Sequence, residues 1–153
     1  MLNIEIVYLG KLDKRWQDLK EHYLKILRPF VVLEFRELKA EKFNEKNQKS
    51  IIANESKKID DFLKKKKFAN IYLLSEKGKC FNSLELADFL HSFDASKLTL
   101  VIGGALGFSE DLKTKYKKIS LSALTFPHQM SQIILLEQIY RSVTISKNKN
   151  YHY

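Results

Sequence analysis

Short apolar segments alternate along this chain with segments of helical spacing, five times in succession. Apolar residues at every second position, as in 31–35, or in a nearly continuous run, as in 97–102, predict a strand. Apolar residues three and four positions apart predict a helix. The predicted strands are 2–10, 31–35, 70–75, 97–102 and 119–126; the predicted helices are 13–28, 49–67, 82–93, a short one that begins at 109, and 127–145. This order is typical of an α/β fold, in which a largely parallel sheet is flanked by helices.

Residues 1–153 are expected to form a single domain, since no repeat or linker interrupts the pattern. Capping residues support the helix starts: Asp13, Ser109, and Asn82 with Glu85, which match a capping box. The longest apolar runs are four or five residues, far short of a membrane span, and residues 1–10 lack the features of a signal peptide. We therefore expect a cytoplasmic protein that does not enter membranes.

The chain carries 27 Lys and Arg against 18 Asp and Glu, a formal charge of +9. A basic surface attracts polyanions, of which RNA and DNA are the commonest. The run Lys64–Lys67 is interpreted as a solvated helix end, with an RNA contact as the alternative. The single Cys80 excludes an internal disulfide and is interpreted as a small filler, and the four histidines lack metal-ligand spacing, so no metal is expected.

Ligands of parallel α/β sheets bind beyond the carboxyl ends of the strands, which directs attention to the loops after Leu74, Ile102 and Thr125. Gly103 and Gly104 follow the most apolar strand, and paired glycines let the backbone approach a ligand. Their spacing fits neither the dinucleotide fingerprint nor a P-loop. They form either a ligand-binding loop or a tight strand-to-helix turn.

The last helix and the tail offer further candidates. Ile133 to Leu136 are consecutive, which predicts burial on more than one side and hence a second subunit. Glu137 and Arg141 stand four apart and either pair or reach a substrate. The closing Tyr151–His152–Tyr153 either stacks on a base or docks on the protein itself. His128, at the start of the helix, is either a solvated residue or a catalytic one.

Four motifs together resemble a known family. They are Ile102–Gly104, Leu121–Met130, Leu136–Arg141 and the closing Tyr151–His152. In order and spacing they are similar to the ribosomal RNA large subunit methyltransferase H family of the SPOUT superfamily. The resemblance extends along the whole chain and is most specific in the last 50 or so residues.

The resemblance implies a deep C-terminal trefoil knot and a homodimer with active sites near the subunit interface. It implies methyl transfer from S-adenosylmethionine to N3 of a pseudouridine in 23S rRNA of the assembled ribosome. The implied cofactor-binding residues are Leu74, Gly103, Gly104, Ser122, Ala123, Leu124, Thr125, Phe126 and Pro127. The implied substrate-side and catalytic residues are His128, Arg141, Tyr151 and His152. Gln132 and Tyr153 depart from the family pattern, where basic residues are common.

Within this reading, His152 or a water beside it is the hypothesised base that removes the N3 proton, and Arg141 stabilises the developing charge. Two other functions are consistent with the sequence. One is a non-catalytic ribosome- or RNA-binding protein, suggested by the net charge. The other is a nucleotide-dependent enzyme that uses the Gly103–Gly104 loop.

Overall fold

The computed structural model describes residues 1–66, 70–148 and 151. Its strands are β1 (Leu2–Leu9), β2 (Val31–Leu38), β3 (Asn70–Cys80), β4 (Lys97–Ile102) and β5 (Lys117–Ser120). Its helices are α1 (Lys14–Leu27), the 3-10 helix η1 (Glu45–Asn47), α2 (Gln48–Leu63), α3 (Ser83–His91), α4 (Glu110–Lys115) and α5 (His128–Ser146). All strand pairs are parallel, in the order β2-β1-β4-β3-β5, so the predicted fold class is confirmed.

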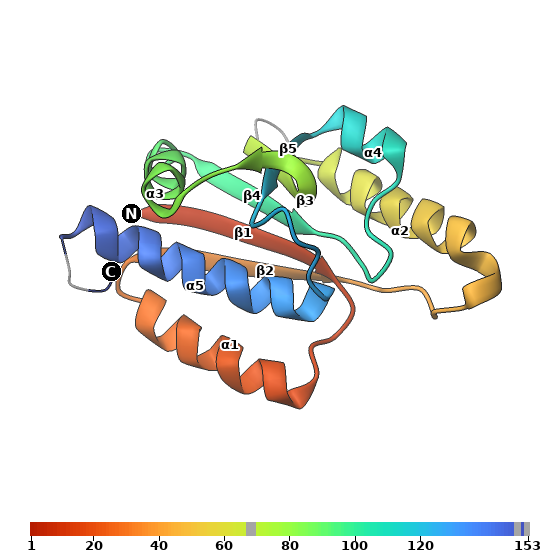
Figure 1. Cartoon of the computed structure of the whole chain (residues 1–153), viewed down its shortest axis with the longest axis horizontal. Helices are drawn as coiled ribbons and strands as arrows, with labels where there is room; N and C mark the ends of the chain where they lie inside the picture. Colours follow the sequence, from red (N-terminus) through yellow and green to blue (C-terminus); the bar gives the residue numbers. More distant parts are fainter. Residues whose placement is uncertain (67–69, 149–150, 152–153) are drawn as a thin grey trace.

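The helices cover both faces of the sheet (Figure 1). One core lies between the sheet and α1, α3 and α5, and the other lies between the sheet and α2 and α4. β1 supplies both cores because its side chains alternate: Ile4 and Ile6 enter the first, whereas Val7 and Leu9 enter the second. No helix in the parts of the chain that the structure describes is long and apolar enough to cross a membrane.

The prediction for the fifth strand was wrong in its bounds. β5 ends at Ser120, and residues 121–126 form a loop. Short side-chain contacts turn the chain away from the sheet: the Ser120 hydroxyl donates to the Ser122 carbonyl at 2.6 Å, and the Leu124 N–H donates to the Ser122 hydroxyl at 3.1 Å. Such local bonds compete with a strand ladder. This loop carries most of the motif that resembles the family.

β3 is longer than predicted, because it includes the expected loop 76–79. Its pairing with β5 shifts register between Leu74 and Lys79, and resumes at Lys79–Ile119 and Cys80–Ser120. The irregular stretch bends β3 and carries Ser75 and Glu76 along the edge of the sheet. The resulting curvature could not be read from the alternation of residue types.

Most predicted helix starts are confirmed. Asn82 and Glu85 form the capping box, with both bonds at 2.9 Å, and the Ser109 hydroxyl accepts from the Leu112 N–H. Asp13 stands at the start of α1 but makes no side-chain cap. Its N–H instead donates to the Gln129 side chain at 2.7 Å, which ties the start of α1 to the first turn of α5. Residues 45–47, which lie outside every predicted element, form η1, and α2 begins at Gln48.

Two lysines of the run at the end of α2 form ion pairs within the protein. Lys64 contacts Asp60 at 2.8 Å, and Lys66 contacts Glu5, a buried residue of β1. Glu5 also pairs with Arg36 of β2 at 3.4 Å. Lys67 lies outside the described residues. Lys64 and Lys66 are therefore paired with carboxylates of the protein itself, which argues against an RNA contact by these two lysines.

Gly78 is required by the approach of β3 to β5. A Cβ at this position would stand 2.5–2.7 Å from the backbone atoms of Ile119, and backbone of a paired strand cannot move aside. We expect Gly78→Ala to lower the free energy of unfolding by about 1–3 kcal/mol. Thermal unfolding measures the loss. Lys79→Ala, an exposed position on the same strand, serves as the control and should change stability by less than about 0.5 kcal/mol.

Asp60 joins α2 to α4 and sets a pH dependence of stability. Burial opposes ionisation, but hydrogen bonds from Lys115, Lys64 and Tyr116 outweigh it and lower the pKa of Asp60 to about 2. Burial and the bond to Asp60 raise the pKa of Tyr116 to about 12. Asp60 thus contributes stability above its unfolded pKa that is lost as the pH falls from about 4 to 2. Tyr116 contributes stability below pH ~10 that is lost as the pH rises toward 12.

Asp60→Asn is expected to remove the acid limb of this profile, and Tyr116→Phe the alkaline limb. Each variant should also lose about 1–3 kcal/mol at neutral pH, because a hydrogen bond to a charged group is broken. Urea unfolding between pH 2 and 12 measures both limbs. An unchanged profile in both variants would show that other groups set the pH dependence.

Candidate functional site

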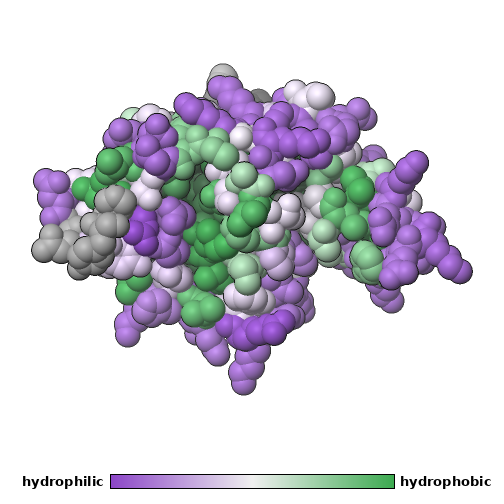
Figure 2. Space-filling model, viewed as in Figure 1, coloured by the Kyte–Doolittle hydropathy of each residue, from purple (hydrophilic) through white to green (hydrophobic). Residues whose placement is uncertain are grey.

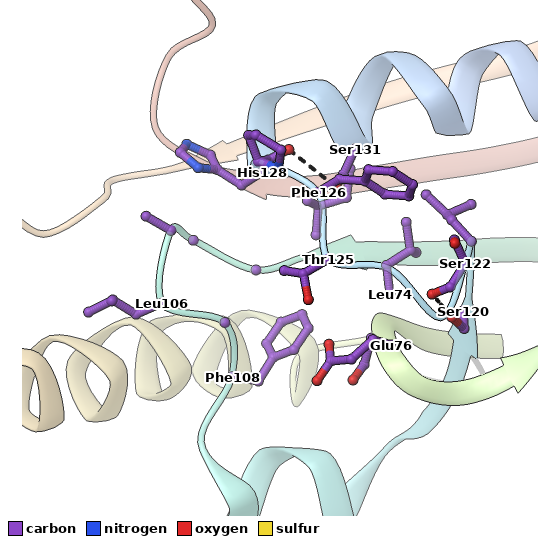
Figure 3. Close-up of a pocket in the computed structure, with 18 of the residues that line it drawn as sticks. Leu74, Glu76, Leu106, Phe108, Ser120, Ser122, Thr125, Phe126, His128 and Ser131 are labelled. Carbon is purple, nitrogen blue, oxygen red and sulfur yellow. Dashed lines mark hydrogen bonds between the residues drawn. The ribbon is translucent and has the colours of Figure 1, made fainter.

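A cavity of about 440 Å³ opens at the carboxyl end of β4, beside residues 74–76 of β3, where the pairing of β3 with β4 ends, and beside the loop after β5 (Figure 3). Its lining residues are Leu74, Ser75, Glu76, Ile102, Gly103, Gly104, Ala105, Leu106, Gly107, Phe108, Lys113, Ser120, Leu121, Ser122, Leu124, Thr125, Phe126, Pro127, His128 and Ser131. The volume is within the range of small-molecule sites, roughly 300–1,000 Å³. The three loops selected by strand-end reasoning therefore meet at one place.

The glycine loop forms one wall of this cavity. The Gly107 N–H donates to the Gly104 carbonyl at 3.0 Å, which closes a tight turn. Gly107 has φ +75°, a conformation that favours glycine. A Cβ on Gly103 would stand 3.2 Å from the ring of Phe108, which is buried beneath the loop. The loop is thus a tight turn, as one interpretation held, and it also lines a ligand-sized cavity. Ligand binding by these glycines stays a prediction.

Two consecutive residues of α2 hold the glycine loop from behind. The Ser56 hydroxyl accepts from the Ser109 N–H at 2.8 Å, which fixes the end of the loop. The Glu55 carboxyl group lies where a Cβ on Gly104 would stand, so this glycine leaves room for it. Glu55 is 3% exposed, and its Oε1 accepts from the Glu41 N–H at 2.9 Å. α2 therefore supports the cavity without lining it.

The segment after β5 forms the opposite wall. Of the residues implied for cofactor binding in this segment, all but Ala123 line the cavity. Figure 3 shows the Thr125 hydroxyl directed toward Phe108 across the cavity. Ser131, in the first turn of α5, donates from its hydroxyl to the Pro127 carbonyl at 3.3 Å and holds the end of the segment on the helix. His128 lies at the rim.

Several lining residues escaped the sequence analysis. Ser75 is the last residue of the predicted strand 70–75, and Glu76 lies just beyond that predicted end, beside Phe108 (Figure 3). Lys113 comes from α4, where its Nζ contacts Glu110 Oε1 at 2.9 Å. A search of every polar residue within two positions of a strand end would have found Glu76. No comparable signal in the sequence points to Phe108 or Lys113.

Arg141 and Tyr151 do not line the cavity. The Arg141 guanidinium contacts Glu137 Oε1 at 2.6 Å and lies 5.0 Å from the centre of the Tyr151 ring, which in turn packs edge-on against Tyr140 at 4.8 Å. Burial and the Glu137 carboxylate raise the pKa of Tyr151, which keeps its phenol neutral. Arg141 lies thirteen positions after His128 in α5, which corresponds to about 20 Å along the helix axis.

Two of the predicted contacts are present within this chain, and the roles inferred for these residues toward a substrate stay predictions. Glu137 and Arg141 do pair, as one interpretation held, and Tyr151 docks on α5 of its own chain. His152 and Tyr153 lie outside the described residues, so the roles inferred for them stay predictions. Gln132 is 2% exposed, and its Oε1 has no hydrogen-bond partner in the described part of the chain. Among residues 1–66, 70–148 and 151, no cluster of acidic, His or Cys side chains suits a metal ion.

Comparison with known proteins places these features in a family. The family model described as "Predicted SPOUT methyltransferase" matches residues 2–152. This chain belongs to the SPOUT methyltransferases. The match includes all the residues that line the cavity and also Tyr151.

Three curated relatives are similar to this chain over nearly their full length. The chain is 38% identical over 155 residues to the ribosomal RNA large subunit methyltransferase H of Thermodesulfovibrio yellowstonii, with 100% of both chains covered. It is 38% identical to the protein of the same name from Thermosipho melanesiensis, covering 99% of this chain and 100% of the relative. The relative from Mycoplasmopsis agalactiae is 37% identical, with 99% of each covered. These similarities confirm the family to which the four motifs pointed.

Proposed function

We propose that this chain is a cytoplasmic methyltransferase that transfers a methyl group from S-adenosylmethionine to N3 of a pseudouridine in 23S rRNA of the assembled ribosome. The observation that carries the proposal is the cavity, which is built from the motifs typical of the family. The names of the full-length relatives support ribosomal RNA as the substrate class. The net charge of +9 supports a polyanionic partner.

The residues of the cavity fit S-adenosylmethionine. Leu74, Ile102 and Phe108 offer apolar surface for an adenine ring, while the glycine loop and the segment Ser122–Pro127 offer backbone polar groups for its edges. Glu76 offers a carboxylate to the positively charged part of the molecule. When bound, the donor supplies a methyl group that its sulfonium has already made electrophilic.

The protein then has to position the acceptor and handle one proton. Alignment of nucleophile and methyl group contributes roughly 7–11 kcal/mol in well-oriented reactions. N3 of the base must lose its proton, and a positioned base adds about 10²–10⁴-fold. His128 at the rim of the cavity orients the incoming nucleotide, and His152 is the proposed base. The Arg141 guanidinium is proposed to stabilise the negative charge that develops on the carbonyl oxygen of the base beside N3.

The distance between the cavity and Arg141 supports a homodimer. In one chain, Arg141 and Tyr151 are bound to α5 about 20 Å from its cavity end, too far to act there. A second chain that packs against α5 brings its own Arg141 to the cavity. Figure 2 shows hydrophobic side chains at the surface over the middle of α5, and Met130 and Ile134 of this helix are half-buried rather than buried. An apolar helix face of this kind suits a subunit interface.

Lysines beside the cavity are positioned to contact RNA phosphates. Lys77 of β3 is exposed, whereas Lys118 of β5 is half-buried and its Nζ donates to the Lys113 carbonyl at 2.7 Å. The positive charges of both help to lower the pKa of Glu110. We expect Lys77→Glu with Lys118→Glu to weaken ribosome binding and to reduce the slope of affinity against salt by about one per lysine. Filter binding at several salt concentrations measures this. Lys46→Glu in η1, which does not line the cavity, is the matched control.

Calorimetry with S-adenosylmethionine, NAD and ATP tests the proposed function against its alternatives. The proposal predicts binding of S-adenosylmethionine alone. A folded protein that binds ATP or NAD in its place is a nucleotide-dependent enzyme. One that binds ribosomes but none of the three ligands is a non-catalytic RNA-binding protein.

A further inference from the structure

The charges that line the cavity are unbalanced. Its ionisable lining residues are Glu76, Lys113 and His128. The Lys113 side chain is 16% exposed and its Nζ contacts Glu110, so its charge is already compensated. Glu76 is exposed and has no hydrogen bond or ion pair with any residue that the structure describes. The carboxylate of Glu76 is therefore available to a ligand.

A second carboxyl group lies directly behind the glycine loop. Glu55 is buried, and one of its oxygens, Oε2, has no hydrogen-bond partner among the described residues. This oxygen occupies the space beside Gly104 that a side chain would fill. Glu55 thus lies against Gly104, which itself lines the cavity. A charge in so poorly solvated a location acts over a longer distance than an exposed one.

We propose that Glu76 and Glu55 make this cavity select the cationic methyl donor over its neutral product. This inference rests on the proposed function. Methyl transfer breaks the S–C bond and leaves the electron pair on sulfur, while a new bond forms to N3 and the N3 proton passes to a base. The sulfonium thereby becomes a neutral thioether. S-adenosylmethionine loses its net positive charge in becoming S-adenosylhomocysteine, so the two carboxylates attract the donor more strongly than the product.

Selection by charge has a consequence for turnover. A site that binds the product less tightly than the donor releases it readily and is refilled by donor even when product is present. A purely steric site offers no such difference, since the product lacks only a methyl group. The two carboxylates therefore protect the enzyme against product inhibition.

Calorimetry on the full chain with S-adenosylmethionine and S-adenosylhomocysteine tests the proposal. For Glu76→Gln we expect donor affinity to fall about 3–5-fold with product affinity unchanged, as for one partly exposed ion pair. For Glu55→Gln the donor-specific loss should be about 5–10-fold, because a buried charge is less screened. Raising the salt concentration should shrink the effect of Glu76→Gln and leave that of Glu55→Gln. Glu45→Gln in η1 is the matched control and should bind both ligands like the natural chain.

Three results would overturn the proposal. If Glu76→Gln binds both ligands like the natural chain, its charge does not select. If donor and product lose affinity equally in both variants, the carboxyl groups serve the shape of the site only. If the natural chain binds neither ligand, the proposed function fails as well. Should Glu55→Gln fail to fold, the comparison of the two ligands on Glu76→Gln still decides the matter, because Glu76 is exposed.

Discussion

Arg141→Ala is expected to reduce methyl transfer to ribosomes by about 10²–10³-fold while leaving the affinity for S-adenosylmethionine unchanged. The guanidinium is held by Glu137 and Tyr151 on α5 and does not line the cavity of its own chain. Its loss should therefore spare donor binding and remove a charge that acts on the acceptor. Single-turnover methylation and calorimetry, run on the same preparation, measure the two effects separately.

Arg141→Lys is the conservative variant. It keeps the charge but loses the planar fork, so we expect only partial recovery of the rate. Lys147→Ala, at the end of the same helix, is the control for loss of a nearby cation. A fall in donor affinity as large as the fall in rate would contradict the assignment, since Arg141 would then support the cavity of its own chain.

Mixing two impaired variants, at a donor concentration too low to load Gly104→Ala, tests whether the subunits share a site. In a dimer of one Arg141→Ala chain and one Gly104→Ala chain, one cavity is intact and faces an intact Arg141 from the other chain. Random exchange of subunits should then restore about a quarter of the natural activity. If each chain used its own Arg141, every site in the mixture would carry a defect, and no activity would return.

Gly104→Ala is the second variant for which we expect a large effect, here on donor affinity and on stability. Its new methyl group would collide with the Glu55 carboxyl group, which is buried and bound to the Glu41 N–H. Either Glu55 or the glycine loop must move, and the loop is a wall of the cavity. We expect donor affinity to fall by about 10–100-fold and the free energy of unfolding to fall by about 1–3 kcal/mol. Calorimetry and thermal unfolding measure these.

A second substitution identifies the cause. Glu55→Ser removes the atoms that the new methyl group meets, so the double variant should recover part of the stability lost in Gly104→Ala. Gly107→Ala is the matched control, because nothing lies within 4 Å of its Cβ position and its cost comes from φ +75° alone. Glu55→Ser should not rescue Gly107→Ala. Strictly additive losses for Gly104 and Glu55 would contradict the steric account.

The order of elements and the place of the site were predictable, because both follow from local pattern. The nearly continuous apolar run in residues 97–102 indicates a strand covered on both faces, and parallel strands bring their carboxyl ends together. The end of β5 was not predictable from apolar residues alone, because Ser120 and Ser122 turn the chain by side-chain bonds. Apolar residues such as Leu121 continue past the turn, where they line the cavity instead of the sheet.

The features that the sequence did not predict depend on contacts between segments that are far apart in the chain. Glu55 reads in the sequence as an ordinary polar residue of a surface helix, yet it is buried against a glycine 49 positions later. Glu76 lies at the cavity because the register of β3 shifts beyond Leu74, and no local sequence pattern predicts that shift. Tyr151 docks on Arg141 and Tyr140, a contact that joins the tail to α5 and that one interpretation of the tail had predicted. The trefoil knot implied by the family resemblance stays a prediction.

Labelled methyl transfer is the most direct test of the account as a whole. The purified protein is incubated with methyl-labelled S-adenosylmethionine and ribosomes from a strain that lacks the modification, and the labelled base is then mapped. We expect one labelled position, N3 of a pseudouridine in 23S rRNA, and loss of the label when the Arg141→Ala variant is used. A folded protein that leaves ribosomal RNA unlabelled, or that labels a different type of base, contradicts it.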